Sequence, residues 1–252
     1  MNFMIISPTA GLQRYATLSK HHMVLAHIHD PKYMQFYRER RALGEWLLLD
    51  NGAYETGRPM ETKELCKQIS YYKPQVVVLP DYPEQPYTQT LRASADFLKH
   101  HAKRFPEVEW MFVPQAPKWD LAQWYSAARA MKGLEVSWVG LSRIPAMLSN
   151  QPHIRMVWAQ FIREHYPKLK MHALGMLHGD YRELYYLDKL GVSSIDSSAP
   201  VWRGWHAHFL DDQWDGLDVN FNAQMSTWPA DLDRHQFILR NLEACHVRTT
   251  TR

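Results

Sequence analysis

Cysteine is scarce in this chain, which carries only Cys66 and Cys245 among its 252 residues. Two thiols cannot form a disulfide framework or a structural zinc site by themselves, so we expect free thiols and a cytoplasmic location. Long apolar runs are absent as well. Runs such as 46–49 and 76–79 are far shorter than the roughly 20 residues that span a bilayer. The opening MNFMIIS lacks a basic segment and a small-residue cleavage site, so we expect no secretory signal.

A strong charge of one sign is also missing, because 29 Lys and Arg face 26 Asp and Glu, for a net charge of +3. This balance neither demands nor forbids a nucleic-acid partner, since a local patch decides that. Hydrophobic residues make up 46% and charged residues 22%, which excludes a disordered, collagen-like or coiled-coil chain. Ten Trp and thirteen Tyr are many for this length, and they suit either well-packed cores or base stacking.

The chain has no internal repeat and no Gly/Ser linker, and it alternates short apolar runs with amphipathic ones. The short runs are rich in Val, Ile, Leu and Met, as is typical of parallel strands buried on both faces. We predict eight strands, at 3–7, 23–27, 46–50, 75–80, 109–114, 136–141, 171–176 and 193–197. Helices are predicted from caps and breakers at 30–41, 62–72, 87–105, 120–131, 151–166, 180–190 and 231–245.

Eight strands that alternate with helices predict an α/β fold, a (β/α)8 TIM barrel that spans residues 1–252 as one domain. Residues 200–252 would supply the last barrel helix and a C-terminal helical extension. The gap between the first two strands is short for a helix. A doubly wound open sheet is the competing arrangement, but neither G-x-G-x-x-G nor a Walker sequence occurs.

Polar residues and glycines follow the apolar strands, at the barrel end where active sites form. Asp50, Asp81 and Asp196 end the third, fourth and eighth strands, and Gln115 ends the fifth. Each alone suits a turn or a cap. A carboxylate after a strongly apolar strand is costly unless it is paired, hydrated or functional, so the series predicts one shared site.

The same segments resemble the tRNA-guanine transglycosylases and their relatives that act on DNA. The resemblance rests on Asp50-Asn51-Gly52-Ala53-Tyr54, Asp81, Gln115, Gly140-Leu141-Ser142, Leu174-Gly175 and Ile195-Asp196-Ser197-Ser198-Ala199-Pro200. It covers about residues 46–205 and keeps the order of the family's motifs. It implies a (β/α)8 barrel that exchanges guanine for a 7-deazaguanine base, a glycosyl transfer that needs no metal or other cofactor.

The chain departs from the tRNA-acting members on the polynucleotide side. The zinc-binding cysteine cluster of those enzymes is missing, and Trp202 stands where the family has Arg. The closest resemblance is therefore to compact, zinc-lacking, phage-type 7-deazaguanine DNA transglycosylases. DNA is the favoured partner, with a free 7-deazaguanine base as co-substrate and the host cytoplasm as the location. A tRNA substrate is the alternative, and the sequence leaves the oligomeric state open.

The resemblance implies a role for each site residue. Asp196 would be the nucleophile that attacks C1′ of the sugar, and Asp50 would carry the proton. Asp81 would bind the Watson–Crick edge of the base. Gln115 and the backbone of Gly140 would bind O6. The remaining base-pocket residues would be Asn51, Tyr54, Leu141, Leu174 and Gly175. Phosphate contacts are predicted for the basic residues just past strand ends, which are Lys118, Arg143 and Arg203.

Two rivals remain. His27-Ile28-His29, with His172, His178 and Asp196, faintly resembles a metal-dependent amidohydrolase-type barrel. That family has H-x-H on its first strand, however, and here it follows the second. His172 is also early in its strand, where we expect it to point away from the mouth. The other rival is a nucleic-acid-binding barrel without catalysis, against which the three retained carboxylates argue.

Overall fold

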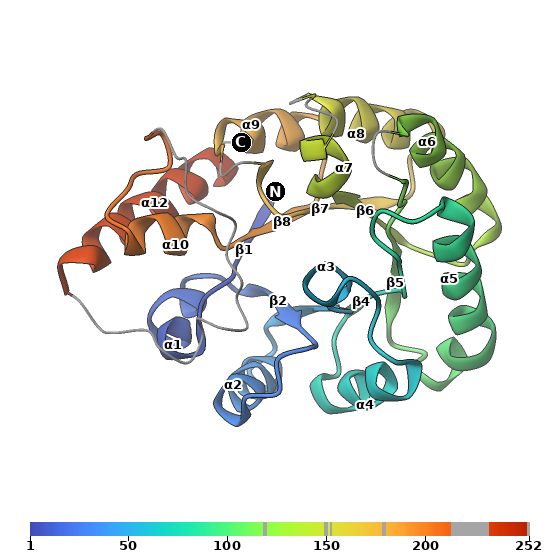
Figure 1. Ribbon diagram of the computed structural model, residues 1–252. Helices are drawn as coiled ribbons and strands as arrows, with labels where there is room; N and C mark the ends of the chain where they lie inside the picture. Colours follow the sequence, from blue (N-terminus) through green and yellow to red (C-terminus); the bar gives the residue numbers. More distant parts are fainter. Residues whose placement is uncertain (118–119, 149–150, 152, 178–179, 213–231, 251–252) are drawn as a thin grey trace.

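The computed structural model describes residues 1–117, 120–148, 151, 153–177, 180–212 and 232–250, and these form a nearly closed (β/α)8 barrel. The prediction of an eight-stranded α/β barrel is confirmed. Figure 1 looks into the ring of strands, with the long helices around it and the short α3 in its opening. The strands are β1 (Asn2–Ile5), β2 (His21–Leu25), β3 (Trp46–Asp50), β4 (Val76–Val78), β5 (Glu109–Phe112), β6 (Trp138–Ser142), β7 (Lys170–Leu174) and β8 (Ser194–Ser197).

The sheet runs in the order β1-β8-β7-β6-β5-β4-β3-β2, and every neighbouring pair is parallel. β1 and β2 pack against each other at the seam. All eight strands therefore present their C-terminal ends at the same opening, which we call the mouth. Residues that are far apart in sequence meet there, because each follows or ends one of these strands. This arrangement positions the site.

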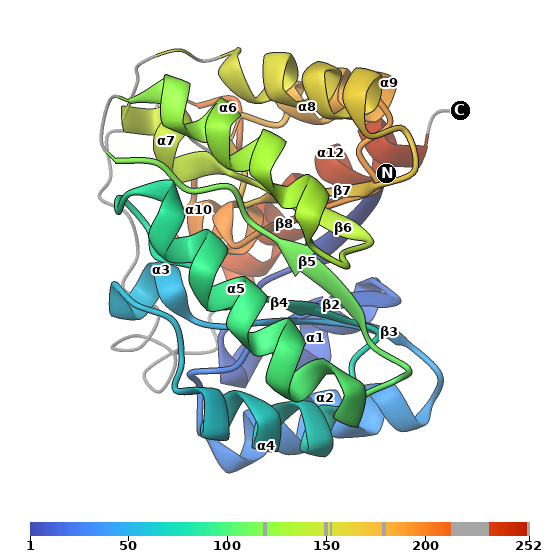
Figure 2. The ribbon, with the colours of Figure 1, turned by 90° about the vertical axis from the view of Figure 1, so that its right-hand side faces the viewer.

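The long helices lie on the outside of the barrel, as the side view in Figure 2 also shows. Asp30 caps the first long helix by accepting the N–H of Tyr33 at 2.9 Å, and Pro31 begins it, as the sequence predicts. The segment between β1 and β2 forms only short turns around α1. The helices are α1 (Leu12–Tyr15), α2 (Pro31–Ala42), α3 (Ala53–Thr56), α4 (Thr62–Tyr72), α5 (Tyr87–His101), α6 (Leu121–Ala130), α7 (Arg143–Leu148), α8 (Ile154–His165), α9 (Arg182–Lys189), α10 (Ala199–Trp205) and α12 (Leu232–Thr250).

Three predicted helices differ clearly from the structure in their bounds. The one expected at 87–105 ends at His101 and continues as a short 3₁₀ turn, the one expected at 151–166 is the shorter α8, and the one expected at 231–245 continues to Thr250 in α12. The short helices α3 and α7 follow β3 and β6 directly and were not predicted. Both are near the mouth, where a brief helical turn can carry side chains inward without the periodic apolar pattern that marks a packed helix.

The C-terminal segment closes the helical layer between β8 and β1. α12 packs against α10, α9 and β1. The close approach needs glycine, because a Cβ added at Gly204 would lie 2.5 Å from the backbone nitrogen of Ile238. Within the described chain, every helix is too short or too polar to cross a bilayer.

Side chains alternate between the two faces of each strand. Val139, Leu141 and Ile195 face outward and pack in a cluster with Trp124 of α6 and Trp158 of α8, whose rings stack at 4.3 Å. The barrel interior is apolar halfway up, where Met111, Val113 and Leu174 surround Gly140. Its floor, at the N-terminal end of the strands, carries the Trp46 and Trp138 rings 5.7 Å apart. The Lys170–Glu109 ion pair lies beside Trp138 at this floor, whereas the buried carboxyl groups of Asp50, Asp81 and Asp196 lie at the mouth.

Candidate functional site

Three buried carboxyl groups lie at the mouth, as the strand-end pattern predicts. Asp50 is the last residue of β3, Asp196 lies in β8, and Asp81 follows β4 by three residues. Burial raises the pKa of Asp50 well above its usual value, and the negative charges of Glu55, Asp81 and Asp196 raise that pKa further. Carboxyl groups that influence one another in this way share one weakly solvated region.

Asp81 is held by two side-chain amides. Asn51 Nδ2 donates to Asp81 Oδ1 and Gln115 Nε2 donates to Asp81 Oδ2, each at 2.6 Å. Asn51 is fixed in turn, because Nδ2 also donates to the Leu79 carbonyl and Oδ1 accepts the Ala53 N–H. Burial raises the pKa of Asp81 to about 6, against the lowering effect of both amides. Gln115 Oε1 is buried without a hydrogen-bond partner among the described residues. An unsatisfied acceptor of this kind is costly, so it marks a place where a ligand donor would be favoured.

Asp50 sits at a sharp turn. Gly52 has a left-handed backbone with φ of 73°, and its N–H donates to Asp50 Oδ2 at 2.8 Å. A Cβ at Gly52 would lie 3.0 Å from His27 Cβ. Glycine is therefore required both by the backbone conformation and by the space. The turn sends α3 back across the edge of the mouth.

Glu55 on α3 is a site residue that the sequence reasoning missed. Its Oε2 lies 3.7 Å from His27 Nδ1, and burial raises its pKa to about 7, with the charges of Asp196 and Asp81 adding to the effect. The local signal was a carboxylate in the first turn of a short helix after DNGAY. The apolar periodicity of the chain does not reveal that this turn folds inward.

Among the described residues, the hydrogen bonds to the Asp196 carboxylate reach one of its two oxygens. Oδ1 lies 3.1 Å from His172 Nε2 and accepts the Gly175 N–H at 2.9 Å. The expectation that His172 points away from the mouth is wrong. His172 pairs with Ser194 across β7 and β8, and this register brings its ring to the same face as Asp196. The left-handed backbone of Gly175, with φ of 69°, turns the N–H toward the carboxylate.

Buried Arg155 and Glu183 support the loop after β7. Arg155 donates from a terminal nitrogen to the Gly175 carbonyl at 2.6 Å, and its Nε lies 3.2 Å from Glu183 Oε1. Glu183 Oε2 accepts the Leu177 N–H at 3.0 Å. The carbonyl and the N–H of Gly175 are thereby both fixed, which gives the Asp196 side chain a rigid partner.

The other predicted base-pocket residues are divided between the two faces of the sheet. Gly140 and Leu174 face the interior, where a Cβ at Gly140 would lie 2.8 Å from Val113 Cγ2 and 3.0 Å from Leu174 Cδ1. The interior beside Gly140 is therefore filled by apolar side chains. Leu141 faces the outer helices and is fully buried there, so only its backbone can meet a ligand.

At the rim, Arg143 and Tyr54 form a pair. Arg143 donates to the Tyr54 hydroxyl at 3.1 Å, and its guanidinium lies 5.3 Å from the centre of the Tyr54 ring. The aliphatic part of Arg143 crosses Gly175, since a Cβ there would meet Arg143 Cδ at 2.7 Å. Tyr54 is 46% exposed, so its ring stands at the edge of the mouth and not deep inside.

The predicted phosphate contacts have different outcomes. Arg143 lies at the rim, as expected of such a residue. Arg203 does not, because its side chain is buried and donates to the Leu210 carbonyl at 2.8 Å. The structure therefore gives no support to Arg203 as a phosphate ligand. Lys118 lies outside the described residues, and so does His178 of the amidohydrolase alternative.

The described histidines of that alternative do not come together. His27 faces Glu55, whereas His29 is exposed. Within the described ranges, no three His, Cys, Asp or Glu side chains are grouped so that they could hold a metal ion.

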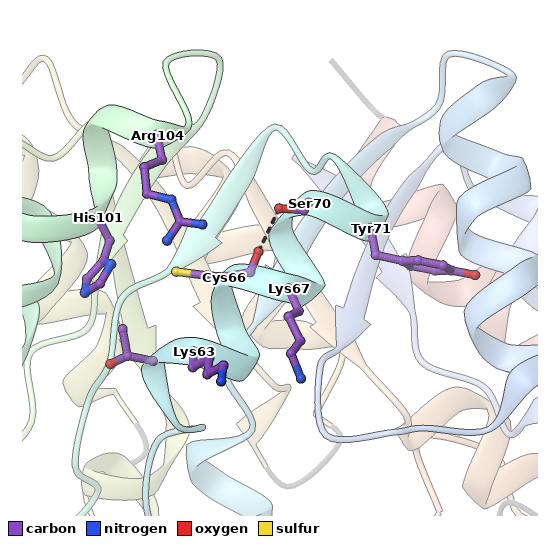
Figure 3. Close-up of a pocket in the computed structure, with 8 residues that line it drawn as sticks. Lys63, Cys66, Lys67, Ser70, Tyr71, His101 and Arg104 are labelled. Carbon is purple, nitrogen blue, oxygen red and sulfur yellow. Dashed lines mark hydrogen bonds between the residues drawn. The ribbon is translucent and has the colours of Figure 1, made fainter.

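A separate hollow of about 770 Å³ lies outside the barrel, between α4 and the end of α5. Its lining is Thr62, Lys63, Cys66, Lys67, Ser70, Tyr71, His101 and Arg104, most of which Figure 3 labels. None of the mouth carboxylates takes part in it. Its cationic side chains stand on the outer wall of the barrel, so it belongs to the surface and not to the site.

No family model and no curated protein matches this chain.

Proposed function

We propose that this protein is a glycosyltransferase, a pentosyltransferase that exchanges guanine in a polynucleotide for a 7-deazaguanine base through a covalent aspartyl-sugar intermediate. The observation that carries the proposal is the different bonding of three buried carboxyl groups at one mouth of the barrel. Asp196 has one oxygen held and one available, Asp81 accepts from two amides, and Asp50 is buried with a raised pKa. A nucleophile, a base clamp and a proton carrier need these three environments.

In the first step, Asp196 attacks C1′ of the sugar and a C–O bond forms while the C1′–N9 bond breaks. The electron pair of that bond stays on N9 of the departing guanine, and Asp50 delivers the proton that neutralises it. Burial and the neighbouring carboxyl charges raise the pKa of Asp50, which favours the protonated form that this step needs. This is the double-displacement logic of a retaining glycosidase, with a base in place of water as the second acceptor.

In the second step, the incoming 7-deazaguanine gives its N9 proton to Asp50 while N9 attacks C1′. The Asp196–sugar bond breaks, and Asp196 leaves as a carboxylate. Asp50 ends the cycle protonated, as it began. The overall reaction needs no oxidant, reductant or added proton.

The base would be bound by donors and acceptors that match guanine. Asp81 accepts from the N1–H and the exocyclic amine, while the Gln115 amide and the Gly140 backbone serve O6. Charge-assisted bonds of this type contribute roughly 1.5–3 kcal/mol each. Leu174, which lies beside Gly140 in the barrel interior, would contact one face of the purine ring. Both 7-deazaguanine and guanine carry this same edge, as an exchange reaction requires.

DNA is the favoured polynucleotide, with tRNA as the alternative, because the chain lacks the zinc-binding cysteines of the tRNA-acting enzymes that it resembles. A guanine in a duplex must leave the stack to reach the mouth, so the enzyme would act on a flipped or single-stranded nucleotide. Arg143 at the rim would contact phosphate. A phage-type DNA-modifying enzyme of this kind would work in the host cytoplasm.

The test is base exchange by the full chain. DNA and tRNA are incubated separately with labelled guanine or a 7-deazaguanine base, and the nucleosides are analysed by mass spectrometry. We expect exchange into DNA and, after denaturation, a protein–DNA adduct that Asp196→Ala loses. The matched control is Asp96→Asn on the exposed face of α5, which should behave like the parent protein. Exchange by Asp196→Ala at the parent rate would refute the nucleophile, and no exchange into either polymer would refute the function.

A further inference from the structure

We propose that His172 is a positioning residue that selects Oδ2 of Asp196 as the attacking oxygen and stabilises Oδ1 when the aspartate leaves. The inference rests on the proposed function, because it assumes that Asp196 is the nucleophile. It adds His172 to the site and assigns different roles to the two oxygens of Asp196. The strand-end pattern of the sequence predicts neither.

The geometry begins with the pairing of β7 and β8. His172 lies opposite Ser194, and Asp196 is two residues further along β8 on the same face. The imidazole ring is fully buried between them, with Nδ1 2.8 Å from Ser194 Oγ and Nε2 3.1 Å from Asp196 Oδ1. Both ring nitrogens are therefore engaged, which fixes the plane of the ring.

The partners also decide where the proton lies. An ionised carboxylate can only accept hydrogen bonds, so His172 must donate to Asp196 from Nε2. In the tautomer that donates from Nε2, Nδ1 is an acceptor, and the Ser194 hydroxyl donates to it. Ser194 thus acts through His172 as a partner that holds the donor tautomer, in the way that outer groups orient metal-bound or catalytic histidines.

The two oxygens of Asp196 become different as a result. Oδ1 accepts from His172 and from the Gly175 N–H, whereas Oδ2 has no hydrogen-bond partner among the described residues. The Asp196 side chain is 12% exposed, so it is not sealed off from the mouth. An oxygen without donors keeps its lone pairs for attack, and the rigid hold on Oδ1 limits the directions in which Oδ2 can point.

The same two donors act again in the second step. While the sugar ester exists, Oδ2 is bonded to C1′ and Oδ1 is the ester carbonyl. As the C1′–Oδ2 bond breaks, negative charge returns to the carboxylate and is shared by Oδ1. Donors that are already in place at Oδ1 stabilise this charge without reorganisation, which is the principle of an oxyanion hole.

A histidine with a purely structural role could be buried in the same way, so the test must separate a structural role from a positioning role. His172→Phe keeps the ring and removes both nitrogens, His172→Gln restores one donor, and Ser194→Ala removes the partner of Nδ1. The matched control is His22→Phe. His22 is likewise buried and bonded to a carboxylate, Glu45 at 2.7 Å, but it packs against α2 outside the barrel.

For guanine exchange into the preferred polymer, we expect kcat of His172→Phe to fall about 100-fold, as on loss of one oxyanion-hole donor. KM for the free base should stay unchanged, because Asp81 and Gln115 are untouched. His172→Gln should recover part of kcat, and Ser194→Ala should lose about tenfold. His22→Phe should lose thermal stability but not kcat. Equal kcat in His172→Phe and the parent protein would overturn the inference, as would a loss that follows the melting temperature in all four variants.

A measurement without substrate keeps this inference apart from the proposed function. In ¹⁵N-histidine-labelled protein, two-dimensional NMR should report His172 as the neutral Nε2–H tautomer in the parent chain and a mixture of tautomers in Asp196→Ala. An Nδ1–H tautomer in the parent chain would overturn the assignment of donor and acceptor. A parent protein that exchanges guanine while His172→Phe is unaffected refutes only this inference, whereas a parent protein without exchange refutes the proposed function.

Discussion

Replacement of Asp81 by asparagine is expected to stabilise the protein above about pH 6 and to abolish base exchange. Asp81 is buried and has a pKa raised to about 6. An acid with a raised pKa in the folded state binds a proton more tightly there than in the unfolded chain. Its ionisation therefore destabilises the fold, and stability falls as pH rises from the unfolded pKa through the folded one.

The magnitude follows from the two pKa values. A rise from 3.8 to about 6 corresponds to about 3 kcal/mol, at about 1.4 kcal/mol for each pH unit. Asparagine cannot ionise, so Asp81→Asn should gain up to about 3 kcal/mol over the parent protein at about pH 8 and almost nothing at about pH 4. One donor of the new amide would face the Gln115 amide. A turn of the Gln115 amide would bring its unpartnered Oε1 to that donor.

The assay is urea unfolding of both proteins at several pH values, with exchange activity measured in parallel. Activity should be lost, because asparagine presents one acceptor where the base edge offers two donors. Asp96→Asn serves as the matched control, since its carboxylate is exposed on α5, and it should change neither quantity. The reasoning is refuted if Asp81→Asn is less stable than the parent chain by the same amount at all pH values, or if it exchanges bases normally.

Three further outcomes are expected. Gly140→Ala should lower the free energy of unfolding by about 1–3 kcal/mol through overpacking and raise KM for the free base. Gly133→Ala is the control, because a Cβ there meets nothing within 4 Å, and it should change neither quantity. Urea unfolding and kinetics compare the two variants. Trp158→Ala should cost about 3–5 kcal/mol, because it removes one ring of the buried Trp124 stack, and an unchanged melting temperature would contradict that packing. Glu55→Gln should flatten the pH profile of kcat around pH 7, where Glu55 titrates; a profile identical to that of the parent protein would exclude Glu55 from the proton path.

The sequence by itself determined the barrel fold and the end of the barrel at which the candidate site lies. Parallel strands buried on both faces appear as short apolar runs, and β3 was predicted with its observed bounds of Trp46–Asp50. Their C-terminal ends meet at one opening, so Asp50, Asp81 and Gln115 could be expected near one another from chain order alone. The hydrogen bond of 2.6 Å between Gln115 and Asp81 agrees with that expectation.

Tertiary structure alone decided which side chains complete the site. His172 meets Asp196 because of the register of β7 on β8, and a shift by one residue would turn the imidazole to the other face. Glu55 enters because the left-handed turn at Gly52 folds α3 inward. Arg203 is not at the mouth, because it is buried in α10, which packs against α12. The local sequence pattern predicts which face of a strand is buried and where the strand ends. Contacts between distant residues depend on strand register, turns and helix packing, which no single segment encodes.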